Sequence, residues 1–392
     1  MIKRISILIL IAVFFMACQT GKEDAKNFSD DYSKVTEKLK EMRSQVKKRD
    51  DYVAYNAEKT REYENLLKKY EKSPAIEEIE ILRSKLLLGL KKTDEAEKKI
   101  DKVLAKKPGL VTEAKMVKVK ILMEKKQYEE AHNIFKEIES QVKDPNDLLN
   151  VYFYLGLEHK DIKVKEEYAK KFLNTKQMPE EHAKNRFIVY LFLSAFASEE
   201  GDLVKARQIL NEGIAETKDE RNKATLAKTL EQFDYLGKEA FPLSGGTWMN
   251  SSDLKLKDLK GQVVVLSFWA PYCPSCRTLT PSLVDLYNEN KNRGFTIIGL
   301  TRLYGTYSDD VEDKGNVNKE EELELIKKYL ERKKIPYPIV VTEDKSVIDS
   351  YKIAGLPTLV FIDKKGNISF TKIGAGSLPF IKQRIKQLLE ET

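Results

Sequence analysis

Residues 262–277 read QVVVLSFWAPYCPSCR, and this stretch decides the fold of the C-terminal part of the chain. Its first half is a nearly continuous apolar run, which is typical of a strand buried on both faces of a sheet. Its second half contains Cys273-Pro274-Ser275-Cys276. Pro274 suits the first turn of a helix, because the N–H that proline lacks has no partner there. The stretch therefore predicts a buried strand, a turn and a helix, with both cysteines at the turn.

Two cysteines at this spacing in a strand-to-helix turn indicate redox chemistry. Unpaired N–H groups and the dipole at a helix start stabilise a thiolate, and a cysteine one turn later can attack a mixed disulfide. We therefore expect Cys273 to be the nucleophile and Cys276 the resolving thiol. One alternative is a structural zinc site, which needs two further ligands, whereas the third cysteine, Cys18, lies at the far end of the chain. Another alternative is a structural disulfide, which leaves the position at the turn unexplained.

The residues that follow alternate between helix and strand patterns. Strands are expected over 295–300, 338–341, 358–362 and 368–373, and helices over 318–333, 345–351 and 377–389. The last two strands form a hairpin across a turn rich in Asp, Lys, Gly and Asn. This order predicts a mixed α/β sheet.

The motif Phe268-Trp269-Ala270-x-x-Cys273-Pro274-x-Cys276-Arg277 resembles thioredoxin, and in particular the TlpA/ResA-like branch of exported, membrane-tethered thioredoxins. Gly355-Leu356-Pro357-Thr358 resembles the loop in which thioredoxins carry a cis-proline that faces the active site. The resemblance implies that the backbone of Leu356 pairs with an extended substrate and that Pro357 packs beside the cysteines. It also implies substrate contacts by Trp269, Tyr272 and Pro274, and an exchange that uses no cofactor and no metal.

Three positions depart from this family. Ser267 stands where thioredoxins carry a buried aspartate, and Leu279 stands where the TlpA/ResA branch often has a glutamate. Tyr272 replaces the usual tryptophan before the first cysteine. The two missing carboxylates handle protons in the family, so the resemblance assigns that role to no residue here. A peroxidase of the peroxiredoxin group is a weaker alternative, because Ala270 stands where that group requires threonine.

The N-terminus has the pattern of an export signal. Lys3 and Arg4 precede an apolar run over residues 5–17, which is too short to span a bilayer as a helix. The run ends at Ala17-Cys18 and resembles a bacterial lipoprotein signal. The resemblance implies cleavage after residue 17 and a lipid anchor on Cys18.

This interpretation of the N-terminus predicts a cell-envelope protein that faces the periplasm or the exterior. Phe15 and Met16 depart from the family's usual leucine and small residue. Gln19 is not the aspartate that retains some lipoproteins in the inner membrane, which favours the outer membrane where one exists. The alternatives are an ordinary secretory signal, in which Cys18 is incidental, and an uncleaved anchor.

Residues 73–237 show a repeating helical pattern. An alanine recurs at Ala96, Ala131, Ala169 and Ala206, and four residues after each stands an apolar side chain: Ile100, Phe135, Leu173 and Leu210. The pattern resembles the tetratricopeptide repeat, a pair of helices repeated about every 34 residues. The resemblance implies a solenoid that binds a protein partner. The alternative is a helical bundle without repeats.

The composition argues against a bundle of membrane helices and against a disordered tail. The chain has 69 basic and 62 acidic residues, interspersed, and 41% apolar residues, which indicates a globular protein with a solvated surface. The sequence contains no basic stretch with interleaved aromatic residues, which is the pattern that would indicate a nucleic-acid partner. The three histidines, at positions 132, 159 and 182, lack metal-ligand spacing.

The sequence therefore predicts a multidomain chain, an all-α helical-repeat solenoid followed by an α/β thioredoxin-fold domain. The expected parts are a signal peptide over 1–17, a flexible spacer and surface helices over 18–72, repeats over 73–237 and a thioredoxin-like domain over 238–392. We expect a thiol-disulfide oxidoreductase that reduces client proteins and is itself reduced by an upstream donor. The alternative is a docking lipoprotein that uses both regions only as binding modules.

Overall fold

The computed structural model describes the backbone of residues 2–46, 48–106, 109–243, 245–374 and 378–391. It describes side chains in these ranges from Thr20 onward, except at position 49. The side chains of the expected signal peptide and of Cys18 lie outside this description. In the ranges described, no helix is both long enough and apolar enough to cross a membrane. The chain forms two compact units, Met1–His182 and Ala183–Thr392.

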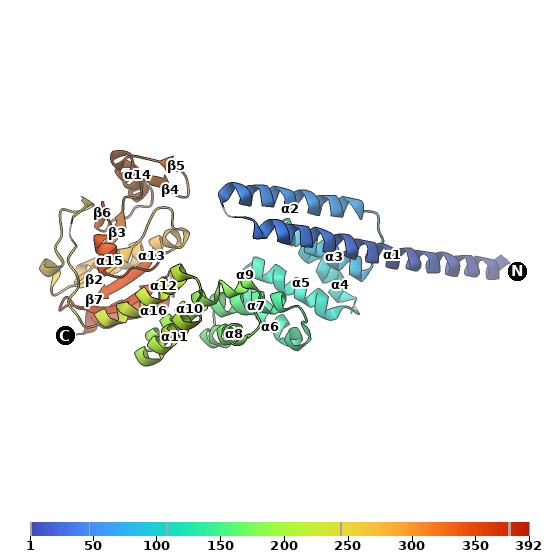
Figure 1. Cartoon of the computed structure of the whole chain (residues 1–392), viewed down its shortest axis with the longest axis horizontal. Helices are drawn as coiled ribbons and strands as arrows, with labels where there is room; N and C mark the ends of the chain where they lie inside the picture. Colours follow the sequence, from blue (N-terminus) through green and yellow to red (C-terminus); the bar gives the residue numbers. More distant parts are fainter. Residues whose placement is uncertain (1, 47, 107–108, 244, 375–377, 392) are drawn as a thin grey trace. The chain divides into compact units, whose positions relative to one another are not determined.

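The first unit is helical and is drawn in blue to green in Figure 1. It contains α1 (Ile2–Ser44), α2 (Arg49–Lys69), α3 (Glu77–Gly89), α4 (Thr93–Ala105), α5 (Val111–Glu124), α6 (Tyr128–Ile138), α7 (Pro145–Glu158), α8 (Ile162–Asn174) and the short α9 (Glu180–Ala183). A 3₁₀ turn, η1 (Glu139–Gln141), follows α6. Helices α3 and α4, α5 and α6, and α7 and α8 pack against each other as consecutive pairs.

The expected flexible spacer is helical in the structure. Residues 20–44 continue α1, and the ring of Phe28 stacks on Tyr70 with 4.2 Å between the ring centroids. Lys38 Nζ lies 2.6 Å from the carboxylate of Glu58 and 2.5 Å from that of Glu62. The buried ring and the ion pairs hold α1 against its neighbours, so this polar segment gains its order from packing rather than from its own composition.

Small residues of the repeats lie at close helix contacts. A Cβ atom added to Gly156 on α7 would lie 2.9 Å from the backbone nitrogen of Ala169 on α8, so the two helices approach too closely for a side chain there. Three residues after Ala169, Phe172 is fully buried. Leu173, the apolar residue that the repeat pattern singles out four positions after Ala169, is only half-buried. The four alanines that recur in the sequence are all buried: Ala96, Ala131, Ala169 and Ala206.

The second unit begins with three helices: α10 (Arg186–Glu199), α11 (Leu203–Glu216) and α12 (Glu220–Gln232). They share one compact unit with the sheet, so the structural division falls before these helices, whereas the sequence pattern places it at residue 237. The short η2 (Phe233–Tyr235) connects α12 to the thioredoxin fold.

The thioredoxin fold is a six-stranded sheet in the order β1-β6-β3-β2-β7-β8. Strand β2 pairs in parallel with β3, and β3 with β6, while β1, β7 and β8 are antiparallel to their neighbours. The strands are β1 (Thr247–Met249), β2 (Val263–Phe268), β3 (Phe295–Arg302), β6 (Ile339–Thr342), β7 (Thr358–Ile362) and β8 (Ile368–Ile373). The helices are α13 (Pro274–Asn290), α14 (Lys319–Arg332), α15 (Ser346–Ser350) and α16 (Leu378–Glu390), with the 3₁₀ turns η3 (Leu256–Leu259) and η4 (Lys291–Arg293).

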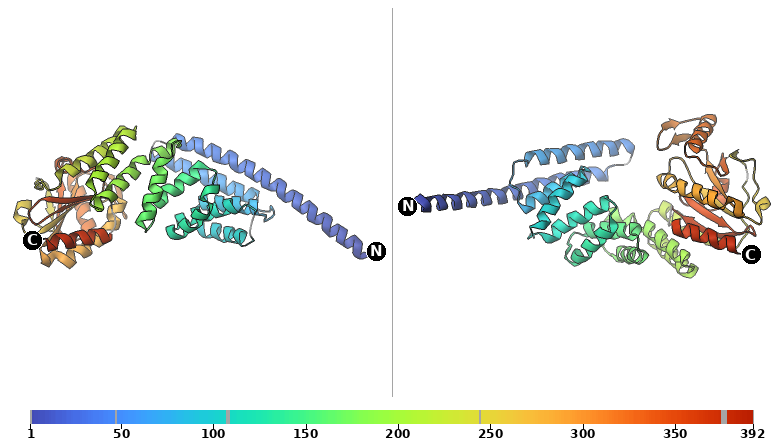
Figure 2. Two further views of the ribbon diagram at one scale, coloured as in Figure 1. Left: turned by 90° about the horizontal axis from the view of Figure 1, so that it is seen from below. Right: turned by 180° about the vertical axis from the view of Figure 1, so that it is seen from behind.

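Strand β2 is buried on both faces, as its apolar run predicts. Val263 and Val265 join the core beneath α13, α14 and α16, whereas Val264 and Leu266 join the core beneath α15. Figure 2 shows α16, in red, and α13, in orange, on the same side of the sheet. This arrangement fixes the C-terminal end of β2, where the turn to α13 begins.

Two features of the fold have no counterpart in the predicted elements. Strand β1 is an edge strand of three residues paired with β6. A small hairpin of β4 (Thr306–Ser308) and β5 (Asp313–Asn316) lies in the segment between β3 and α14.

Candidate active site

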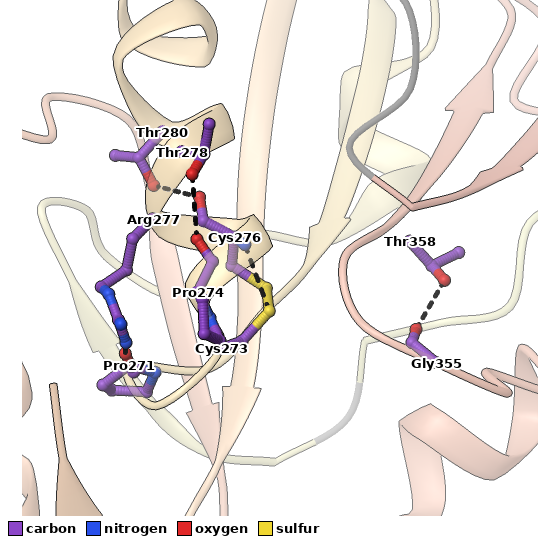
Figure 3. The surroundings of a disulfide bond; sticks show 9 residues. All are labelled: Pro271, Cys273, Pro274, Cys276, Arg277, Thr278, Thr280, Gly355 and Thr358. Atoms are coloured by element: carbon purple, nitrogen blue, oxygen red, sulfur yellow. Dashed lines mark hydrogen bonds between the residues drawn. A yellow bond between two sulfur atoms is a disulfide. The ribbon is translucent and has the colours of Figure 1, made fainter. Parts of the chain in front are cut away.

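Cys273 lies immediately before the first residue of α13, at the position that caps the helix. Its backbone is extended, with φ −81° and ψ 108°, and its Sγ accepts a hydrogen bond from the backbone N–H of Cys276 at 3.2 Å. Figure 3 shows this contact at the start of the helix. The sulfur therefore occupies the place where a capping oxygen usually satisfies an orphan N–H group of the first turn.

Cys273 and Cys276 form a disulfide in the structure, with 5.2 Å between their Cα atoms. Both side chains are buried in this oxidised form, with exposed fractions of 6% for Cys273 and 3% for Cys276. The structure thus brings together the two cysteines that the sequence paired, in the state that follows oxidation of the dithiol.

Two hydrogen bonds hold the turn around the disulfide. Arg277 Nη1 donates to the carbonyl of Pro271 at 2.9 Å, and Thr280 Oγ1 donates to the carbonyl of Cys276 at 2.9 Å. Pro274 is the first residue of the helix and is exposed. The turn is therefore fixed from both sides while its tip faces solvent.

The loop before β7 lies in the surroundings of the disulfide (Figure 3). The Leu356–Pro357 peptide bond is cis, as the resemblance implied. Thr358 Oγ1 donates to the carbonyl of Gly355 at 2.7 Å, and the N–H of Gly374 donates to the carbonyl of Pro357 at 2.7 Å. Leu356 is half-buried and packs against the apolar cluster that contains both cysteines. The cis-proline loop and the disulfide, far apart in sequence, therefore border the same apolar core.

The two aromatic residues of the motif have different surroundings. Trp269 is buried, and its ring stacks on Tyr329 of α14 with 5.4 Å between the centroids. Tyr272 is 45% exposed, and its ring meets the ring of Tyr304 edge to face at 5.0 Å. Of this pair, only Tyr272 offers its ring to a partner from solvent in this oxidised structure.

In the described part of the chain, the two positions of the missing family acids carry no substitute carboxylate within hydrogen-bond reach of the disulfide. Ser267 and Leu279 are both buried, and among the residues described no carboxylate is hydrogen-bonded to either cysteine sulfur. Glu322, a buried acid of α14, instead accepts hydrogen bonds from the backbone N–H groups of Tyr304 and Gly305. Burial raises the pKa of the nearby Tyr329 hydroxyl, which keeps that group neutral.

Two of the three histidines meet in the first unit, which their sequence spacing does not reveal. The rings of His132 and His159 lie 5.3 Å apart between centroids, and His132 Nδ1 is 3.2 Å from the hydroxyl of Tyr168. Burial lowers the pKa of His132, and the neighbouring His159 lowers it further. Among the side chains described, no group of three or more potential metal ligands comes together.

Comparison with known proteins points to the same chemistry. A family model described as AhpC/TSA family matches residues 238–371. The chain is 30% identical to "Thiol-disulfide oxidoreductase ResA" of Halalkalibacterium halodurans over 142 residues, which are 36% of this chain and 69% of that protein. It is 25% identical to "Sporulation thiol-disulfide oxidoreductase A" of Bacillus subtilis over 132 residues, 34% of this chain and 69% of that protein.

A solved thiol:disulfide interchange protein of the thioredoxin family from Chlorobium tepidum TLS is also similar. Its sequence identity is 27% and the TM-score is 0.31, with 38% of this chain and 95% of that chain covered. The family assignment rests on the relatives found by sequence comparison. Their names describe thiol-disulfide exchange, which is the reaction that two cysteines at a helix start can perform. The chain belongs to the ResA-like family of thiol-disulfide oxidoreductases.

Proposed function

We propose that the protein reduces disulfides of client proteins through Cys273 and Cys276. The Cys273 thiolate attacks one sulfur of a client disulfide, forms a mixed disulfide and releases the other client sulfur as a thiolate. The Cys276 thiolate then attacks Cys273 Sγ, closes the Cys273–Cys276 disulfide and releases the second client thiol. The client gains two electrons and the protein loses two, so an upstream thiol donor must reduce the protein before the next cycle.

The observation that carries this proposal is the N–H of Cys276 directed at Cys273 Sγ at 3.2 Å. A donor at the start of a 17-residue helix stabilises negative charge on the sulfur, so Cys273 is favoured as the attacking thiolate. Cys276 lies within the first turn of the same helix and is bonded to Cys273 in this oxidised structure. The exchange uses only these two sulfurs and requires no cofactor.

The test is the reduction of insulin disulfides by the full-length protein in the presence of dithiothreitol, followed by turbidity. We expect the protein to accelerate precipitation, and Cys273→Ser to remove the acceleration. Thr278→Ala, on an exposed position of the same helix, is the matched control and retains it. A folded protein with no effect on insulin would favour the alternative, a docking lipoprotein that performs no exchange. The reduction potential of the pair would establish the direction in the cell, for which we propose reduction.

We also propose that the protein is anchored in the cell envelope by a lipid on Cys18 and faces the periplasm or the exterior. The support is the short apolar run that ends at Ala17-Cys18. In the native host, Cys18→Ala should leave the membrane fraction, whereas Thr20→Ala should stay in it. Membrane retention of a processed Cys18→Ala protein would overturn the anchor.

We propose, finally, that the helical pairs of the first unit bind a protein partner. Large apolar side chains remain exposed on them, among them Tyr154 on α7 and Ile162 on α8. Stacked helical pairs commonly present such residues to partners. Crosslinking from Tyr154 replaced by a photoreactive residue tests this proposal, and a lack of any adduct in the native host would contradict it.

A further inference from the structure

The exposed tyrosine of the redox motif belongs to a row of three side chains. Tyr272, which precedes Cys273, meets Tyr304 edge to face, with 5.0 Å between the centroids and 87° between the planes. The guanidinium carbon of Arg302 lies 4.0 Å from the centroid of the Tyr304 ring. The row, which we call the arginine–tyrosine rim, therefore leads from Cys273 to a cation on the last residue of β3.

The rim is held in place by hydrogen bonds, two of which are accepted by a buried carboxylate. Glu322 is 2% exposed, and its two carboxylate oxygens accept the N–H of Tyr304 at 2.8 Å and the N–H of Gly305 at 2.9 Å. Arg302 Nη1 donates to the carbonyl of Leu303 at 2.8 Å. Burial and the contact with Tyr272 raise the pKa of Tyr304, so its hydroxyl stays neutral. A client thus meets a surface that is already arranged, which reduces the entropy lost on docking.

Arg302 has no acidic partner in the described part of the chain. Asp309 pairs with Arg332, and Asp310 with Lys333, so these acids of the neighbouring hairpin are already neutralised. Arg277, on the other side of Cys273, donates to a backbone carbonyl and forms no ion pair among the described side chains. A guanidinium that rests on an aromatic ring keeps N–H groups at its edge, and these match a carboxylate well.

We propose that the arginine–tyrosine rim selects client segments that carry an aspartate or glutamate close to the reactive cysteine. The client carboxylate pairs with Arg302 while the client backbone runs over Tyr272 toward Cys273. This inference rests on the proposed exchange reaction and adds the class of client that the site prefers. It concerns the rate of formation of the mixed disulfide and leaves the chemistry of the two sulfurs unchanged.

The experiment uses three peptides, each with one cysteine in a mixed disulfide with a chromogenic thiol. They differ only in one residue two positions from the cysteine, which is Asp, Asn or Lys. The second-order rate constant of each is measured with the reduced full-length protein. The order Asp, Asn, Lys is expected, with an Asp-to-Asn ratio of about two to five at low salt, the range for an exposed ion pair. Because salt screens exposed charges, the ratio should approach one at about 1 M salt.

Variants test whether Arg302 is the cause. Arg302→Gln should reduce the Asp-to-Asn ratio to about one, and Arg302→Lys should retain part of it. Tyr304→Leu, which removes the ring beneath the guanidinium, should also lower the ratio. Arg293→Gln is the matched control, because Arg293 lies beyond the far end of α13 and bonds only to Asn290 among the described residues. It should keep the wild-type ratio.

Two results would overturn the proposal that the arginine–tyrosine rim selects acidic client segments. One is equal rates for the Asp and Asn peptides with the wild-type protein at low salt. The other is an Asp-to-Asn ratio that Arg302→Gln leaves unchanged while circular dichroism shows a native fold. A protein that reacts with none of the three peptides would instead overturn the proposed exchange reaction, so the two failures are distinguishable.

Discussion

Lys372 of β8 and Glu199 of α10 form an ion pair although 173 residues separate them in the sequence. The side chain of Lys372 is 5% exposed and that of Glu199 is 17% exposed, so the pair is largely removed from water. Gln232 of α12 adds a second connection, because its Nε2 donates to the carbonyls of Tyr351 and Lys352 after α15. Helices α10 to α12 are therefore part of the structure that supports the thioredoxin sheet.

Glu199→Ala should lower the free energy of unfolding of the second unit by about 2 kcal/mol or more, because it leaves the Lys372 ammonium buried without its partner. Glu200→Ala, at the exposed neighbouring position, is the control and should change stability by less than about 0.5 kcal/mol. Urea unfolding followed by tryptophan fluorescence measures both. Equal effects of the two substitutions on the free energy of unfolding would show that the ion pair does not stabilise the fold.

A fragment that starts at Ala183 should be more stable than one that starts at Lys238. The shorter fragment lacks Glu199 and Gln232, so Lys372 and the carbonyls after α15 lose their partners. A difference in melting temperature on the order of 5–10 °C is expected for a chain of this size. Calorimetry of the two fragments measures it, and equal melting temperatures would contradict the division of the chain at residue 182.

Asp309 should make the fold sensitive to acid. Burial opposes its ionisation, but hydrogen bonds from Tyr307, from the backbone of Glu312 and Val311 and from Arg332 lower its pKa from 3.8 to about 2. Because the folded pKa lies below the ordinary value, the ionised carboxylate stabilises the fold fully above about pH 4. This contribution, about 1–2 kcal/mol after allowance for solvent screening, is lost as the pH falls toward 2.

The measurement is the free energy of unfolding between pH 7 and pH 2.5. Asp309→Asn should be less stable than wild type at pH 7 and should lose less stability on acidification. Asp285→Asn, at an exposed position of α13, is the control and should follow the wild-type curve. If the Asp309→Asn curve runs parallel to wild type, the carboxylate does not contribute as described.

Local patterns predicted the backbone geometry around the two cysteines. The run from Val263 to Phe268 is buried on both faces because every residue in it is apolar or small, and the turn after it follows from Pro274 at the helix start. The cis Leu356–Pro357 bond follows from a short motif that resembles the thioredoxin loop. These features depend on neighbours in sequence, which a reading of the sequence captures.

Features that depend on distant partners were not predictable in this way. A lysine on a strand is usually exposed, and Lys372 is buried only because Glu199 reaches it from α10. Residues 20–44 look like a polar spacer, but Phe28 stacks on Tyr70 and orders them. Phe172 rather than Leu173 is buried because helical periodicity allows a contact after either three or four residues.

The order of the two cysteines is the central claim, and trapping of mixed disulfides tests it most directly. Cys276→Ser and Cys273→Ser are expressed in the native host, quenched with acid and separated on a non-reducing gel. Cys276→Ser should accumulate adducts through Cys273, because no thiol remains to resolve them. Cys273→Ser should accumulate few, because Cys276 lies within the first turn of α13 whereas Cys273 lies at the start of the helix. Abundant adducts on Cys273→Ser with none on Cys276→Ser would contradict the assignment of Cys273 as the nucleophile.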